Sequence, residues 1–149
     1  MKLEKITAEM LIADGWTPHQ AGGFDGFVGP VWSKDDGDTR TMGLLVEERH
    51  CNNHLGTLHG GVVMTFADIG LGTGVTRLLG EKRMNCVTVS LNTQFVSVAK
   101  LGEFVTVSAE VVRQTRSLIF VRGLLQVGDK TIANCEGIWK VLEGDVRRR

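Results

Sequence analysis

The residues best suited to chemistry lie in one short stretch, where His59, Gly60 and Gly61 are followed, eight residues after Gly60, by a single carboxylate, Asp68. The apolar pattern after the glycines predicts a helix from about Gly61 to Leu79. The first N–H groups of a helix have no partner inside it and lie at the positive end of its dipole. Glycine there lets a ligand oxygen come close to the backbone, so the stretch predicts a donor site for an oxyanion.

Two side chains near this helix start are candidates to assist the backbone donor. His59 could add a donor or orient a carbonyl, and Asn53 in the preceding loop could donate its amide. Each also has a purely structural interpretation. A lone histidine is more often structural than catalytic, and loop asparagines are usually turn residues. Because Asn52 is adjacent, the sequence leaves open which of the two asparagines would donate its amide.

The spacing of Asp68 limits what it can do together with Gly60. Eight residues of helix correspond to about 12 Å along the axis, so one substrate carbonyl cannot contact both groups. Asp68 is then either a buried acid held by a serine, threonine or backbone donor, or a carboxylate that acts on a site in another subunit. A two-fold dimer with antiparallel helices would bring Asp68 of one chain opposite Gly60 of the other. Such a close helix contact could use Gly70, Gly72 and Gly74.

The remaining chain predicts one helix among strands. A short helix is expected from Thr7 to Asp14, with Thr7 as N-cap and Met10 and Leu11 facing inward. A loop rich in Gly and Pro follows over residues 15–30. Alternating apolar residues then predict strands over 31–34, 39–48, 87–98, 104–112, 118–127 and 132–142, with hairpin chemistry at 35–38.

This order predicts an α+β fold in which a long central helix is wrapped by an antiparallel sheet of about six strands. The long helix is apolar around much of its circumference, so it should be buried on more than one side. Its three glycines indicate that another backbone comes close. We expect an N-terminal helix and loop over 1–23 and one domain over 24–149.

Composition excludes several other classes of protein. Lys plus Arg equals Asp plus Glu at 17 each, and the one basic run is Arg147–Arg149, so no nucleic-acid partner is expected. No run of about 18 apolar residues predicts a membrane span. The three cysteines match no metal or disulfide spacing, which predicts free thiols and no metal site. Without a targeting signal, the expected location is the cytoplasm.

The segment RHCNNHLGTLHGGVVMTFADIGLG resembles the signature of hotdog-fold acyl-CoA thioesterases of the phenylacetate-degradation (PaaI-like) branch. The segment TVSLNTQFVSVAKLGEFVTVSAEVVRQTRSLIFVRG resembles the strands that follow in that family. The resemblance covers about residues 24–142. It implies a homodimer with sheets joined edge to edge, or a homotetramer of such dimers, with active sites at the dimer interface.

The resemblance also implies roles for the candidate residues. The Gly60 N–H, with the His59 and Asn53 side chains, would polarise the thioester carbonyl, and Gly61 would help to bind substrate. Asp68 from the partner chain would be the general base or the nucleophile. Thr88 would hold the attacking water, with Ser90 as the alternative. Strand alternation puts both on one face, so periodicity does not choose between them.

The implied reaction is hydrolysis of a medium-chain or aryl acyl-CoA to the free acid and CoA, with no cofactor because CoA is part of the substrate. Arg116, Arg113 and Lys100 are candidates for the CoA phosphates. The aromatic residues of the 15–30 loop either line the acyl pocket or form an apolar plug: Trp16, Phe24 and Phe27. His50 and His54 are expected on the surface. The alternatives are a hotdog protein that binds acyl-CoA without turnover, and a hydratase or dehydratase, which needs a different Asp/His arrangement.

Overall fold

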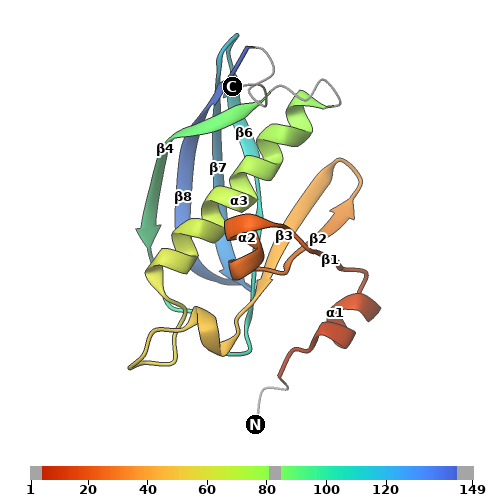
Figure 1. Cartoon of the computed structure of the whole chain (residues 1–149), viewed down its shortest axis with the longest axis vertical. Coiled ribbons are helices and arrows are strands. Elements are labelled where there is room, and N and C mark those ends of the chain that lie inside the picture. Colours follow the sequence, from red (N-terminus) through yellow and green to blue (C-terminus); the bar gives the residue numbers. More distant parts are fainter. Residues whose placement is uncertain (1–4, 81–84, 144–149) are drawn as a thin grey trace.

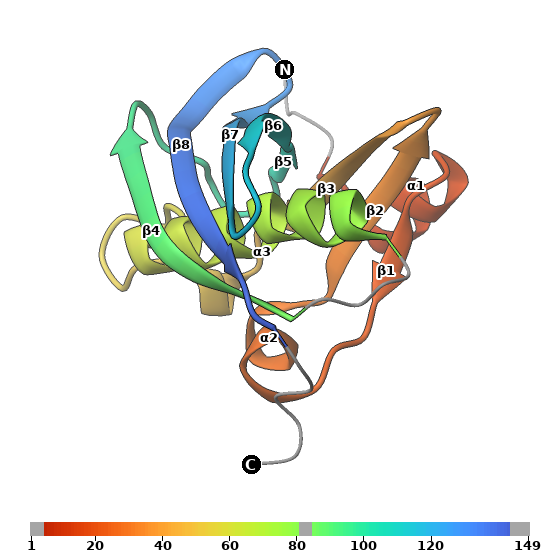
Figure 2. The ribbon, with the colours of Figure 1, turned by 90° about the horizontal axis from the view of Figure 1, so that it is seen from above.

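The long helix α3, Gly60–Leu79, is the axis around which one curved sheet is built (Figures 1 and 2). The structure is a computed structural model that describes residues 5–80 and 85–143. The sheet has eight strands in the order β1-β2-β3-β5-β7-β8-β4, with β6 paired to β7, and all of the described pairings are antiparallel. The expected α+β class, a long helix wrapped by an antiparallel sheet, is confirmed, and the arrangement is the hotdog fold.

The elements have the following bounds. The strands are β1 Thr17–His19, β2 Val31–Asp36, β3 Thr39–Leu45, β4 Cys86–Phe95, β5 Phe104–Ser108, β6 Glu110–Gln114, β7 Leu118–Val127 and β8 Lys130–Val141. The helices are α1 Ala8–Ala13, α2 Gly23–Val28, the 3-10 turn Glu48–His50, and α3.

Two expectations about the elements were wrong. The 15–30 segment is not all loop, because residues 17–19 pair with the edge of β2 and residues 23–28 form α2. The expected strand 104–112 is two strands that separate at Ala109: β5 pairs with β3, and β6 pairs with β7. Alternation is the same on both sides of Ala109, so a local pattern does not reveal a change of partner strand.

The glycines of α3 face the chain's own sheet. A Cβ on Gly70 would lie 2.3 Å from Val107 Cγ1, and one on Gly74 would lie 2.4 Å from the Cβ of Ala109. The expected close contact with another backbone or a second helix is therefore replaced by contact with strand side chains. By length and composition alone, with a mean hydropathy of 1.3, α3 is the one described helix that could cross a membrane. Its contacts with six strands of the sheet identify it as the core helix.

The N-terminal segment packs a second, smaller cluster. Thr7 Oγ1 accepts a hydrogen bond from the Met10 N–H and caps α1 as expected. Leu11 is buried, but Met10 is 45% exposed, because adjacent helical residues point about 100° apart and only one faces the sheet. Trp16 packs edge-on against Phe104 at 4.7 Å between ring centroids, so its ring belongs to this cluster.

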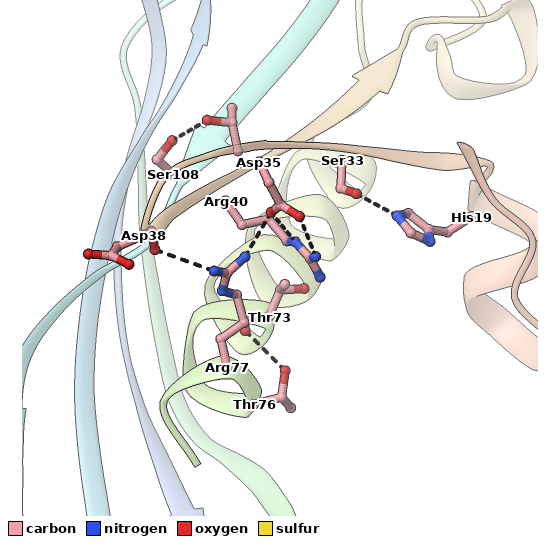
Figure 3. A network of polar contacts seen from close by, with 10 residues as sticks. His19, Ser33, Asp35, Asp38, Arg40, Thr73, Thr76, Arg77 and Ser108 are labelled. Atoms are coloured by element: carbon pink, nitrogen blue, oxygen red, sulfur yellow. Dashed lines mark hydrogen bonds and ion pairs between the residues drawn. The ribbon is translucent and has the colours of Figure 1, made fainter. Parts of the chain in front are cut away.

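An ion-pair network fastens the β2–β3 hairpin to the last turns of α3 (Figure 3). The Asp35 carboxylate accepts two hydrogen bonds from Arg40, at 2.7 and 2.8 Å, and one from Arg77 at 2.8 Å. The Arg40 hydrogen bond is the main cause that lowers the pKa of Asp35 to about 2. The network holds one wall of the fold against α3, while β4 lies along the other side (Figure 1).

Candidate active site

Asp68 lies midway along α3 and is held by Thr88 of β4. The Thr88 hydroxyl donates a hydrogen bond of 2.6 Å to Asp68 Oδ1. Burial first, and the negative charge of Asp68 second, raise the pKa of the Cys86 thiol, two residues before Thr88. The structure thus brings together two residues that the sequence placed only by motif, and it gives the half-buried carboxylate a threonine partner.

Ser90 does not join them. A bulge between Thr88 and Ser90 places Thr88 opposite Trp139, and Ser90 opposite Ile138. The extra residue reverses the alternation, so the expectation that both side chains share one face was wrong. Ser90 instead lines a cavity of about 330 Å³ with Asn92 and Glu136.

The start of α3 presents one unused backbone donor. His59 is the N-cap, and its Nδ1 accepts a hydrogen bond of 2.9 Å from the Gly61 N–H. The N–H groups of Val62 and Val63 bond to the His59 carbonyl. The Gly61 N–H is therefore occupied, and within the described ranges the Gly60 N–H makes no hydrogen bond. Because His59 Nδ1 accepts, Nε2 carries the ring proton and can donate to a ligand.

Phe95, at the end of β4, lies against Gly60. Its ring would be 3.5 Å from a Cβ built on Gly60, and the side chain is 57% exposed. The sequence placed Phe95 only within a strand, and nothing local to it reveals its proximity to Gly60. Because Gly60 has no side chain, a ligand can approach the Gly60 N–H beside the apolar ring of Phe95.

The two loop asparagines have different surroundings. The Asn52 side chain donates to Thr57 Oγ1 and accepts from the Leu55 N–H, each at 2.9 Å, so it holds the turn. Asn53 is exposed and makes no hydrogen bond to the described residues. Of the pair, Asn53 is the one with a free amide near the helix start.

His50 is not a surface residue, contrary to expectation. It is 3% exposed; its Nδ1 accepts from the Glu47 N–H at 3.0 Å and its Nε2 donates to the Val28 carbonyl at 2.7 Å. Burial lowers the pKa of His50. Arg49 also donates to two carbonyls at the end of α2, so both side chains fasten α2 beside α3. His54 is exposed, as expected.

The candidate cations lie at opposite ends of the site. Lys100 forms an isolated antiparallel β-bridge with Thr57 in the loop before α3, so it lies at the Gly60 end of the site. Arg116 lies in the β6–β7 turn, near the end of β4 that contains Val87, because Val87 and Leu118 both pair with Lys140 of β8. Its Nη2 is 3.9 Å from Glu143 Oε1. Arg113 is exposed on β6. Cys51, Cys86 and Cys135 are unpaired thiols, and the described residues contain no cluster suited to a metal. Arg147–Arg149 lie outside the described residues.

Comparison with known proteins identifies the class. The family model of the thioesterase superfamily matches residues 55–133. A Pseudomonas aeruginosa protein named "Putative esterase PA0474" is 32% identical over 113 residues, which cover 75% of this chain and 83% of that protein. Human acyl-coenzyme A thioesterase 13 is 40% identical over 77 residues, 52% of this chain and 53% of that protein, so the match spans about half its length.

A solved structure agrees with these sequence matches. A Bacillus halodurans protein solved with CoA superposes with a TM-score of 0.67 at 28% identity, covering 76% of this chain and 74% of that one. The chain belongs to the thioesterase superfamily and is, by class, a thioester hydrolase.

Proposed function

We propose that this protein is a PaaI-like acyl-CoA thioesterase whose active sites are shared between two chains. The observation that carries the proposal is the position of both half-sites along one strand, β4. At one end Thr88 binds Asp68, and at the other Phe95 lies against Gly60. The relatives named for acyl-CoA hydrolysis, and the neighbour solved with CoA, support the same substrate class.

The edge of the sheet supports a dimer. β4 is the last strand in the sheet order, and apolar side chains of this strand are exposed: Val87, Val89 and Phe95. A long apolar edge favours pairing with another strand. Antiparallel pairing of two copies of β4, about a two-fold axis between Leu91 and Asn92, would set Thr88 of one chain opposite Phe95 of the other. Asp68 would then face Gly60 of the second chain. One substrate carbonyl could contact both groups, although Gly60 and Asp68 of the same helix are about 12 Å apart.

The proposed reaction divides the work between the two chains. The Gly60 N–H, with His59 Nε2–H and the Asn53 amide, holds the thioester oxygen as it becomes negative. Asp68 of the other chain, oriented by Thr88, takes a proton from a water that attacks the carbonyl carbon. The tetrahedral intermediate then breaks its C–S bond, which releases the acid and the CoA thiolate. In the alternative, Asp68 itself attacks and water hydrolyses the resulting anhydride.

The acyl group would contact α2. This helix lies over the side of α3 that the sheet leaves open (Figures 1 and 2). Its rings are largely exposed, Phe24 at 65% and Phe27 at 79%, although large aromatic side chains are usually buried. Exposed aromatic side chains on this side of α3 suit a medium-chain or aryl acyl group. Lys100 and Arg116 would bind the phosphates of CoA.

The test is thiol release from a panel of acyl-CoA esters by the wild type and Asp68→Asn, with size-exclusion chromatography on both. Asp129→Asn, in the exposed β7–β8 turn, is the matched control. We expect Asp68→Asn to lose activity by orders of magnitude while the control and the assembly stay unchanged. If the wild type binds acyl-CoA esters but releases no thiol from any of them, the protein is a binding module and the enzymatic proposal is wrong.

A further inference from the structure

The indole of Trp139 in β8 occupies a slot between two glycines. A Cβ built on Gly72 of α3 would lie 3.5 Å from Trp139 Nε1, and one built on Gly137 would lie 2.6 Å from Trp139 Cζ3. The residue is only 3% exposed. A side chain at position 137 would collide with the ring, so this sequence holds the indole flat against β8 with its nitrogen turned toward α3.

Among residues 5–80 and 85–143, the indole nitrogen of Trp139 has none of the hydrogen-bond partners that a buried indole normally has. Within the described ranges, Trp139 Nε1–H makes no hydrogen bond. Among the described residues, Thr93 Oγ1 is the one side-chain nitrogen or oxygen that is both inaccessible to solvent and without a hydrogen bond. The Trp139 nitrogen is also without a hydrogen bond but is not such an atom, so it retains some contact with solvent. Buried Trp N–H groups usually have an acceptor, and ordered water supplies it where protein atoms do not.

The free N–H lies at the Asp68 end of the site. Trp139 is directly opposite Thr88 in the β4–β8 ladder, which sets their Cβ atoms about 5 Å apart. Gly72 follows Asp68 by one helical turn, so these two positions are also neighbours, at about 6 Å. Thr88 occupies Asp68 Oδ1, and Oδ2 has no hydrogen bond to the described residues. Among the described residues, a donor and an acceptor without a partner therefore lie at neighbouring positions of β8 and α3.

We propose that Trp139 positions the attacking water, donating its indole N–H to an oxygen whose own proton points at Asp68 Oδ2. The inference rests on the proposed thioesterase function and adds a residue to it. A water held in this way donates to Asp68, accepts from Trp139 and keeps a lone pair free for the thioester carbon. On attack the new C–O bond forms, the proton passes to Asp68, and the C–S bond breaks in the next step. Trp139 is a positioning residue because it acts through the water.

The first test separates positioning from packing. Trp139→Phe keeps a ring but loses the donor, and Ile119→Val, opposite Trp139 in β7, trims the same packing without touching the N–H. We expect Trp139→Phe to lower kcat about tenfold with KM within twofold, the loss of one hydrogen bond to the reacting water. In an Asp68→Asn background it should cause no further loss, because the two residues act on one water. A rise in KM alone, or the same loss in both backgrounds, would overturn the inference.

A second measurement does not depend on turnover. Labelling the tryptophan indoles with nitrogen-15 gives signals for Trp16, Trp32 and Trp139, and Trp139→Phe assigns the last. We expect a water contact at the Trp139 N–H and a shift of its signal in Asp68→Asn. No water contact overturns the inference even where thioester hydrolysis is established. If the wild type hydrolyses no thioester, the proposed function fails while this measurement still decides the water site.

Gly72→Ala covers the case in which Trp139→Phe does not fold. The added methyl would stand 3.5 Å from Trp139 Nε1, an ordinary contact, and alanine favours the helix. It should fold and lower kcat by covering the donor. An unchanged kcat in Gly72→Ala would contradict the inference.

Discussion

Thr88 and Asp68 are 20 residues apart in the chain, yet the threonine hydroxyl donates to Asp68 Oδ1 at 2.6 Å. The bond joins the edge strand to the core helix, and Asp68 Oδ2 makes no hydrogen bond to the described residues. A carboxylate held at one oxygen has a fixed orientation, which a general base needs for efficient proton transfer. The bulge after Thr88 is what selects this hydroxyl and turns Ser90 away.

Replacement of Thr88 should separate its hydroxyl from its shape. Thr88→Val keeps the volume and removes the donor, so we expect kcat/KM to fall about tenfold or more. Thr88→Ser keeps a hydroxyl and should stay within a few-fold of wild type. Steady-state kinetics on both variants, with melting temperatures as a check on folding, measure the effect. Equal losses in the two variants would show that the hydroxyl is not what matters.

Gly60→Pro should delete the proposed oxyanion donor without breaking α3. Gly60 is the first residue of the helix, where proline is well tolerated, and His59 has a ψ of 136°, which suits a residue before proline. We expect kcat to drop about a hundredfold, as for the loss of one oxyanion-hole donor. Gly60→Ala keeps the N–H and makes only an ordinary contact with Phe95, so it should retain far more activity. Similar kcat values for the two variants would exclude this N–H as the donor.

Mixing two inactive variants tests whether sites are shared. After subunit exchange between equal amounts of Gly60→Pro and Asp68→Asn, half of the dimers contain one chain of each, and each of these has one intact site. Activity should rise to about a quarter of the wild-type value. If Gly60 and Asp68 of the same chain formed the site, no mixture would contain an intact one and activity would stay at the level of the single variants.

Gly70→Ala should destabilise the protein although alanine is the better helix former. The new Cβ would lie 2.3 Å from Val107 Cγ1, and such overpacking costs about 1–3 kcal/mol, more than the roughly 1 kcal/mol gained in helix propensity. Urea unfolding measures the difference. Val107→Ala in the same chain should recover part of the loss, and Gly72→Ala, with its ordinary contact, should not show it. A stabilised Gly70→Ala would mean that the strand yields easily at Val107.

His50 should make the fold sensitive to mild acid. Burial lowers its pKa in the folded state, so below pH of about 6.5 the unfolded chain binds a proton that the folded chain does not. Its stability contribution is present above that pH and is lost as the pH falls toward the folded-state pKa, by at most about 1.4 kcal/mol per pH unit. Urea unfolding at pH 7.5 and 5.5 should show a smaller pH effect in His50→Gln than in wild type. The exposed His54→Gln is the control, and equal pH effects in all three would contradict the assignment.

Much of the architecture and half of the site geometry follow from local sequence. The apolar periods predicted α3, its start at the glycines and most of the strands, because helix and strand periods are properties of a few neighbouring residues. The rise of a helix also showed that Gly60 and Asp68 of one chain cannot share a carbonyl. The spacing of Gly60 and Asp68 therefore leaves two possibilities, a structural acid or a site that two chains share.

Other features depended on partners far along the chain. The pairing of β1, the exchange of partner strands at Ala109 and the bulge that separates Thr88 from Ser90 are set by which strands lie side by side. The burial of His50 depends on a carbonyl 22 residues away, and the slot for Trp139 depends on a glycine of α3. Period and rise are written in adjacent residues, whereas register, burial and an unpaired donor exist only once distant segments have packed together.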